Sequence, residues 1–243
     1  MEAAEIIREA VASVQRLRAD TAASPELLKS VQAIKRFQAS RFRHTYADLL
    51  NSVEFGPATH FFLEELYSDK DFAERDAQFS RIARALQTLF PSQVVQTAVS
   101  LAQLHRLTEE LDHAMGVAQL QLSKSGKATY AHAWAVVGRR QAREMQLSTV
   151  LVVGAELERF TRMTGLRTML RMMRRPAHAA GLGALQQFLE SGFDTFASMS
   201  GKKQLALEFL DVIKSREMEL IDAIFSNPHI RDADLISNTS IAR

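Results

Sequence analysis

The 243-residue chain contains no cysteine, and this absence removes several classes of chemistry. Without thiols, the chain can form no disulfide bond, no thiolate zinc site, no cysteine-ligated iron–sulfur cluster and no cysteine nucleophile. The absence also fits a reducing compartment. The acidic start lacks the basic and apolar regions of a secretory signal, so we expect a soluble, cytoplasmic protein.

Long apolar runs are absent as well. The most apolar stretch, residues 149–155, is about seven residues long, whereas a membrane-spanning helix needs roughly 18. The sequence therefore predicts no membrane span. The net charge of +2 is too small to indicate a nucleic-acid or membrane partner by itself.

Glycine and proline are scarce, with 10 and 5 copies, while residues of high helix propensity such as alanine, leucine and glutamate are abundant. The one cluster of β-branched residues, at 149–153, lies inside a longer helical pattern and favours a buried helix segment over a strand. The composition and the patterning together predict an all-α protein.

Capping and breaking residues indicate where the helices begin and end. Ser24 followed by Pro25 is typical of a helix start, because serine caps the first turn and proline fits its first position. Pro91 opens a long helix that ends near Ser123. The predicted helices cover 59–67, 72–89, 91–123, 129–146, 148–163, 177–199 and 202–225, with a short basic helix between 165 and 176.

The helix over 91–123 would be roughly 50 Å long at about 1.5 Å per residue. Such a helix is typical of the spine of a bundle or of a helix shared with a second subunit. We expect a single bundle-like domain of about eight or nine helices over residues 1–225, with this helix at its centre. Residues 226–243 carry no periodic apolar stripe, so we expect a loosely ordered tail.

Three motifs occur together in this chain. They are Phe-Phe-Leu-Glu-Glu-Leu-Tyr at 61–67 with Asp-Phe at 71–72 and Arg-Asp at 75–76; Thr-Tyr-Ala at 129–131 with Gly-Arg at 138–139; and Arg-Pro-Ala at 175–177 with Gly-Leu-Gly at 181–183 and Phe-Leu-Glu-Ser-Gly-Phe at 188–193. With them, residues 50–225 resemble an uncharacterised family of bacterial helical proteins, a domain of unknown function. The resemblance implies a bacterial origin and one helical unit, but no activity, cofactor or catalytic residue.

Histidines and carboxylates share one face of the long predicted helix. At about 100° per residue, His105, Glu109 and Asp112 fall within roughly 60° of one another. Imidazole and carboxylate on facing helices are the ligands of di-iron carboxylate bundles. A second such pair lies on one face of the helix over 59–67. The candidate ligand or metal-binding residues are His60, Glu64, His105, Glu109, Asp112 and His113.

The spacing argues against a metal site built on that face. Di-iron bundles carry Glu-x-x-His on two helices, and here Glu110 and His113 match this spacing once, with no second copy. The sequence therefore favours a polar face that contacts solvent or a subunit. An iron or manganese site is the alternative.

Charge is segregated along the chain. Residues 139–175 contain nine arginines and three glutamates, a net charge of +6, whereas residues 54–112 contain ten acidic and five basic residues, a net charge of −5. Three interpretations stay open: the arginines pair with the acidic segment within one chain or across a dimer, they form a solvated face, or they bind an anion. The first is favoured, and no nucleic-acid-binding motif supports a nucleic acid as the anion. The candidate anion-binding residues are Arg167, Arg171, Arg174 and Arg175.

Glycines and large apolar residues mark the region after these arginines. Gly181, Gly183 and Gly192 fall within the predicted helix 177–199, where they are expected to let another helix approach closely. Methionines and phenylalanines nearby favour an ordinary core over a pocket for an apolar ligand. Tyr130 and Trp134 are expected to anchor the core or an interface.

These features favour a non-enzymatic binding or protein-interaction protein that needs no cofactor. The long helix, the glycines and the segregated charges favour a homodimer. The candidate ligands, should the protein bind one, are an apolar or an anionic small molecule. The alternative function is a metal-dependent, oxidase-like helical bundle containing iron or manganese.

Overall fold

The computed structural model describes residues 2–67, 70–124, 126, 128–200 and 205–237. Within these residues the chain is a single all-α domain that is 85% helical and contains no strand, which confirms the predicted fold class. Ten of the helices have seven residues or more, so the structure contains more helices than the eight or nine predicted. No helix in the described ranges is long and apolar enough to cross a membrane.

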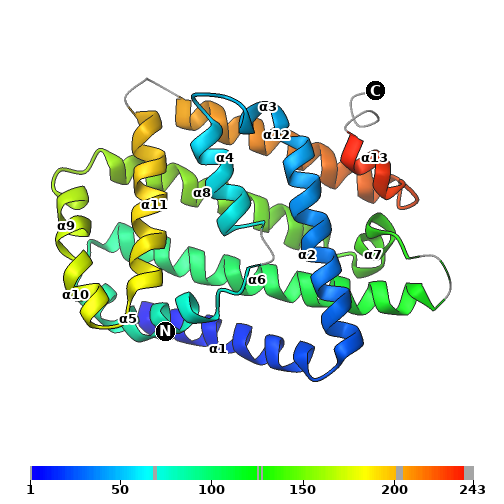
Figure 1. Cartoon of the computed structure of the whole chain (residues 1–243), viewed down its shortest axis with the longest axis horizontal. Coiled ribbons are helices and arrows are strands. Elements are labelled where there is room, and N and C mark those ends of the chain that lie inside the picture. Colours follow the sequence, from blue (N-terminus) through cyan, green and yellow to red (C-terminus); the bar gives the residue numbers. More distant parts are fainter. Residues whose placement is uncertain (1, 68–69, 125, 127, 201–204, 238–243) are drawn as a thin grey trace.

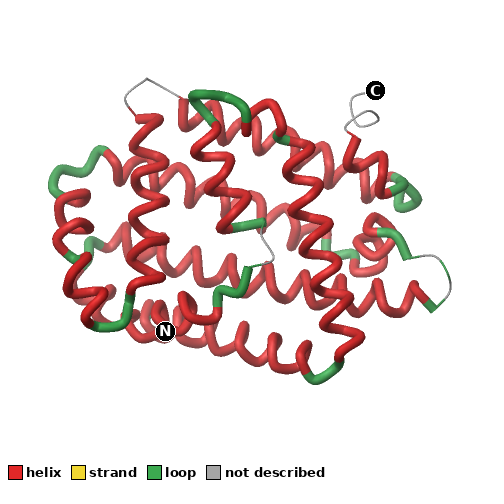
Figure 2. Tube along the Cα trace, viewed as in Figure 1, coloured by secondary structure: helices red, strands yellow, loops and turns green. Residues whose placement is uncertain are grey.

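Short loops join the helices (Figure 2). In chain order the helices are α1 (Ala3–Ala22), α2 (Pro25–Thr45), α3 (Ala47–Leu50), α4 (Gly56–Glu65), α5 (Ala73–Leu89), α6 (Ser92–Ser123), α7 (Tyr130–Val137), α8 (Arg140–Thr161), α9 (Leu166–Met172), α10 (Arg174–Ala179), α11 (Gly183–Ser200), α12 (Leu205–Ser226) and α13 (Asp232–Ser237).

The long helices form two crossing layers (Figure 1). Helices α1, α6, α8 and α12 run along the long axis of the molecule, and neighbours in this order contact each other. Helices α2, α4 and α11 cross this layer, with α2 packed on α6 and α11 packed on α8. Helices α9 and α10 lie at one end of the molecule, and α7 and α13 lie at the other.

Helix α6 is the long central helix that the sequence predicts. It contains 32 residues and contacts α1, α2, α7 and α8, so its apolar surface is covered by its own chain. Gly116 allows α2 to pack closely, because a Cβ atom there would lie 2.3 Å from Val31 Cγ2. The length of this helix is therefore explained within one chain.

Two predicted helix boundaries were wrong, and left-handed backbone explains both. Gly138 and Arg139 have φ angles of +64° and +54°, which end α7, and α8 then continues without a break through the predicted boundary near 147. Gly181, with φ of +66°, separates α10 from α11 where one helix was expected. Gly192 lies inside α11 as expected, and its Cα faces α4: an added Cβ would lie 3.1 Å from the ring of Phe61.

The predicted loosely ordered tail needs a correction as well. Residues Asp232–Ser237 form α13, which packs against α2, and Leu235 is fully buried. The Asp232 carboxylate accepts hydrogen bonds from the backbone N–H of Tyr130 at 2.8 and 3.1 Å. One buried leucine and one helix cap thus hold a segment that is too short to show a periodic stripe. Residues 238–243 lie outside the described residues.

The described core consists of three hydrophobic clusters. The largest joins α2, α3, α4, α6, α7, α8, α11, α12 and α13. A second joins α1, α5 and α6, and a third joins α8, α9 and α11.

Candidate functional site

A pocket of about 120 Å³ lies between the two helix layers. Its lining comes mainly from α2, α6, α7 and α8, with further residues from the α4–α5 region, α11 and α12. The lining is rich in charge of both signs. It includes the cations Lys35, Arg41, Arg75 and Arg143 and the carboxylates Glu65, Glu109, Asp112 and Glu217.

Arg41 and Glu217 form a buried ion pair on one wall of the pocket. Nη1 and Nη2 of Arg41 donate to the two carboxylate oxygens of Glu217 at 2.5 and 3.0 Å. The Tyr46 hydroxyl donates to the same carboxylate at 2.9 Å. Burial alone would lower the pKa of Arg41, but the charge of Glu217 and its hydrogen bonds outweigh this and raise that pKa. The hydrogen-bonding capacity of the pair is thus largely used inside the protein.

Arg143 lies on another wall and is only 4% exposed. Its Nη1 donates to Gln146 Oε1 at 3.2 Å, and its guanidinium carbon lies 4.0 Å from the centre of the Trp134 ring. Its Nε and Nη2 atoms are buried and have no hydrogen-bond partner among the described residues, which also provide no ion pair to it. Burial lowers the pKa of Arg143 because the weak attraction of Tyr130 and Asp112 does not compensate.

Two further buried donors of this pocket's lining residues are unpartnered, namely Trp134 Nε1 and Arg41 Nε. Every unpartnered buried side-chain atom found on the described lining residues is therefore an N–H donor. Buried polar groups are normally satisfied. The chemical group that would complete this pocket is a hydrogen-bond acceptor.

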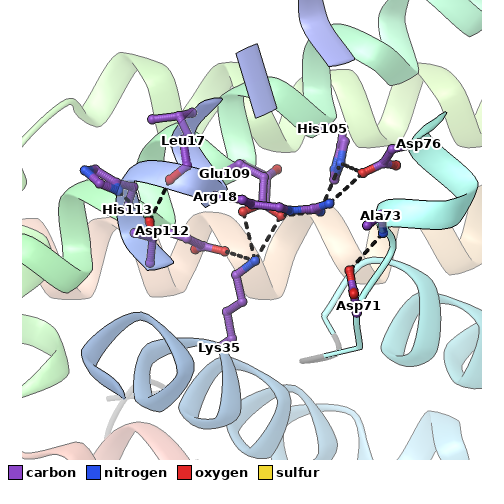
Figure 3. A network of polar contacts seen from close by, with 12 residues as sticks. Leu17, Arg18, Lys35, Asp71, Ala73, Asp76, His105, Glu109, Asp112 and His113 are labelled. Carbon is purple, nitrogen blue, oxygen red and sulfur yellow. Dashed lines mark hydrogen bonds and ion pairs between the residues drawn. The ribbon is translucent and has the colours of Figure 1, made fainter. Parts of the chain in front are cut away.

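A network of acids and bases adjoins the pocket, whose lining includes Lys35, His105 and Glu109 of this network (Figure 3). Arg18 lies between two carboxylates and donates to Asp76 Oδ2 and Glu109 Oε1, both at 2.9 Å. His105 Nε2 lies 2.8 Å from Asp76 Oδ2. Lys35 Nζ donates to both oxygens of Glu109 at 2.9 and 3.0 Å. The network ties α1, α2, α5 and α6 together.

Glu109 and Asp112 lie one turn apart on α6 but differ in their environment. Burial would raise the pKa of Glu109, but the charges of Lys35 and Arg18 outweigh this and lower it. Asp112 accepts a hydrogen bond from Gln38 Nε2 at 3.0 Å, and Lys35 Nζ is 3.8 Å away. For Asp112 burial is the larger effect, so its pKa is raised.

The structure does not bring the six predicted ligand residues together. His60 and Glu64 are exposed on α4, and Glu64 pairs with Lys70 at 3.0 Å. His113 points to Thr21, with Nδ1 2.9 Å from Oγ1. The three that line the pocket are His105, Glu109 and Asp112.

Those three residues are already engaged within the protein: His105 by Asp76, Glu109 by Arg18 and Lys35, and Asp112 by Gln38. Arg18 and Lys35 take up the oxygens of Glu109, and Arg18 together with His105 takes up Oδ2 of Asp76. In the described part of the chain, no three histidine, aspartate or glutamate side chains are grouped in a way that could hold a metal ion. The observed geometry is that of a salt-bridge network.

The four predicted anion-binding arginines lie on the surface at the α9–α10 end. Arg167 pairs with Asp194 at 2.8 Å and Arg174 with Glu190 at 2.7 Å, and both acids belong to α11. Arg171 and Arg175 are exposed. The favoured pairing with the acidic segment 54–112 is found, among the described residues, at Arg139 and Glu110, 3.7 Å apart. Most of the other arginines in residues 139–175 pair instead with acids outside residues 54–112.

Sequence reasoning missed Arg41, Arg143 and Glu217, although a signal exists for two of them. Glu217 interrupts the apolar stripe of α12 between Ile213 and Leu220, which are both buried. Arg143 lies four residues before buried Leu147 on the same face of α8. A charged residue within an apolar stripe predicts a buried charge.

Fold and site together define a single-domain, all-α protein with a buried, charged pocket between two helix layers. Residues 17–229 match the family model described as Domain of unknown function (DUF8198), and the chain belongs to this family. This confirms the predicted membership of a domain of unknown function. No curated protein and no solved structure matches the chain.

Proposed function

We propose that this protein is a binding protein for a small anionic ligand, which it holds in the pocket between the helix layers through Arg143. The observation that carries the proposal is the unpartnered Nε and Nη2 of this buried side chain. These two nitrogens form one edge of the guanidinium, and that edge binds both oxygens of a carboxylate or phosphate in parallel.

The electrostatics of the pocket support an anion over a neutral ligand. A buried charge without a partner is costly, and an opposite charge with good hydrogen-bond geometry offsets that cost. The neighbouring cations are engaged: Arg41 is paired with Glu217, Arg75 with Glu65, and Lys35 with Glu109. Among the described cations that line the pocket, Arg143 is the one without an ion-pair partner, so its charge is available to a ligand. Trp134 Nε1 offers a further donor from the same lining.

The size of the pocket limits the ligand. At about 120 Å³ it is somewhat smaller than a cavity of about 150 Å³ that accepts a molecule the size of benzene. Ordered water is the competing occupant, because water also offers acceptors to the unpartnered donors. The volume of the pocket therefore limits an anionic ligand to a small acid.

The homodimer stays a prediction, and its three grounds have explanations within one chain. Helix α6 is covered by its own chain, Gly192 packs on Phe61, and Arg167 and Arg174 pair with α11. None of these features requires a second copy.

The single tryptophan of the chain provides a direct test, because Trp134 contacts Arg143. Its fluorescence and its indole N–H resonance should change saturably when formate, acetate or phosphate is added at constant ionic strength. Arg143→Met should abolish the response. Arg140→Met, which removes an exposed arginine of the same helix, should preserve it. A wild-type protein that responds to no anion, or an Arg143→Met variant that binds as well as wild type, would contradict the proposal and favour water as the occupant.

A further inference from the structure

A second pocket, of about 130 Å³, lies where the second and third hydrophobic clusters face each other. Its lining is almost entirely apolar. Phe79 and Ile82 of α5 contribute on one side, and Phe160 of α8 and Phe193 of α11 contribute on the other. A pocket with such a predominantly apolar lining is suited to apolar groups.

The two pockets share a partition that is made of side chains. Leu101 and Phe188 line both of them, and Arg75 and His105 also belong to both linings. A third, smaller apolar pocket of about 50 Å³ again has Leu101 and Phe188 in its lining. The polar pocket and the apolar space are therefore neighbours that share lining side chains.

We infer that the ligand is an amphipathic acid, with its anionic group at Arg143 and an apolar body of about six carbons in the second pocket. This inference rests on the proposed anion binding. The size follows because a cavity of about 150 Å³ holds one benzene-sized group. Such a molecule needs hydrogen-bond donors for its anionic group and an apolar surface for its body. The unpartnered donors of the first pocket and the apolar lining of the second provide them. The head group is a carboxylate or a phosphate, since both fit the guanidinium edge.

Chain length is the variable that tests the inference. Wild-type protein is titrated with acetate, butanoate, hexanoate and octanoate, with Trp134 fluorescence as the readout. Each added methylene group should tighten binding about fourfold while it is being buried. The gain should stop near six to eight carbons, when the apolar pocket is full. Hexan-1-ol should bind more weakly than hexanoate, and a comparison of hexanoate with hexyl phosphate identifies the preferred head group.

Filling the apolar pocket provides the matched variant. Val94 lines this pocket and neither of the other two. Val94→Phe should therefore bind hexanoate no more tightly than acetate, while its affinity for acetate equals that of wild type. Leu166→Phe, in the same lining, is a second variant should the first fail to fold. Val53→Phe, at a position that is 96% exposed, is the control and should behave as wild type.

The outcomes separate this inference from the anion proposal. Equal wild-type affinities for acetate and hexanoate, or undiminished hexanoate binding by Val94→Phe and Leu166→Phe, would overturn the amphipathic ligand and leave the anion site intact. Failure of every anion, acetate included, would overturn the anion proposal itself.

Discussion

Arg41 and Arg143 line the same pocket and are buried to the same degree, at 3% and 4% exposure, yet their surroundings are opposite. Arg41 has a bidentate carboxylate partner on α12. Arg143 has an aromatic ring and one amide oxygen. The comparison teaches that burial of a charge does not identify a site. Arg41 has an opposite charge beside it and belongs to the internal packing of the fold, whereas Arg143 has no ion pair and is a candidate for binding a ligand.

The largest effect on stability is expected from breaking the ion pair between Arg41 and Glu217. Glu217→Gln leaves Arg41 buried without an opposite charge, so the free energy of unfolding should fall by about 3–5 kcal/mol in urea denaturation. The double variant Arg41→Met with Glu217→Leu should recover most of this loss, because it removes both charges and fills the space with apolar atoms. A Glu217→Gln variant as stable as wild type would contradict this prediction, because it would show that Arg41 can be buried without the charge of Glu217 at no cost in stability.

Glu109 and Asp112 offer a second comparison, because both are carboxylates that line this pocket. Glu109, with its lowered pKa, stabilises the fold above the pKa of the unfolded chain and loses that contribution as pH falls. Glu109→Gln should therefore cost about 1–3 kcal/mol at pH 7, and the difference from wild type should shrink below about pH 4.5. Asp112, with its raised pKa, opposes folding when it is charged, and this cost disappears as pH falls through that pKa.

Asp112→Asn should accordingly be as stable as wild type or more stable at pH 7, with a difference that also shrinks in acid. Urea denaturation at pH 7 and pH 4 measures both variants. Losses of the same sign and size for the two substitutions would show that Glu109 and Asp112 are equivalent, which would contradict their different surroundings.

Removing the unsatisfied arginine should have a smaller effect of the other sign. Arg143→Met removes a buried charge that lacks an ion pair, and the lost cation–π contact with Trp134 offsets part of the gain. The free energy of unfolding should stay unchanged or rise by about 1 kcal/mol, as measured by urea denaturation without added anions. With acetate or hexanoate present, wild type should gain stability and the variant should not. A loss as large as that of Glu217→Gln would assign Arg143 a structural role.

Local signals predicted much of this fold. Ser24 caps α2 through its hydroxyl as expected, and the start and end of α6 lie within a residue of the prediction. The boundary at 138–139 was missed because Arg139, a residue type that rarely adopts it, has left-handed backbone there. The short helices α10 and α13 are held by tertiary contacts, which a periodic pattern does not register.

The site could be predicted only in part. The sequence favoured a polar face of α6 that contacts solvent or a subunit, whereas Glu109 and Asp112 are buried against residues of α1 and α2, because a single helix does not reveal what it faces. The partners of these residues come from distant elements: Arg18 reaches Glu109 across 91 positions, and Gln38 reaches Asp112 across 74. Contacts between residues so far apart in the sequence depend on how the two helix layers cross. The spacing of residues within one helix does not determine that crossing.

The smallest effect is expected on the surface, where the sequence had placed its candidate anion site. Arg167 and Arg174 form exposed ion pairs with α11, and such pairs contribute little because water and salt screen them. Arg167→Ala and Arg174→Ala should leave the urea midpoint unchanged within error and should leave the Trp134 response to acetate intact. Loss of that response in Arg174→Ala together with its retention in Arg143→Met would move the anion site from the interior to the α9–α10 surface. That pair of titrations therefore decides between the arginines that the sequence favoured and the one that the packing leaves without a partner.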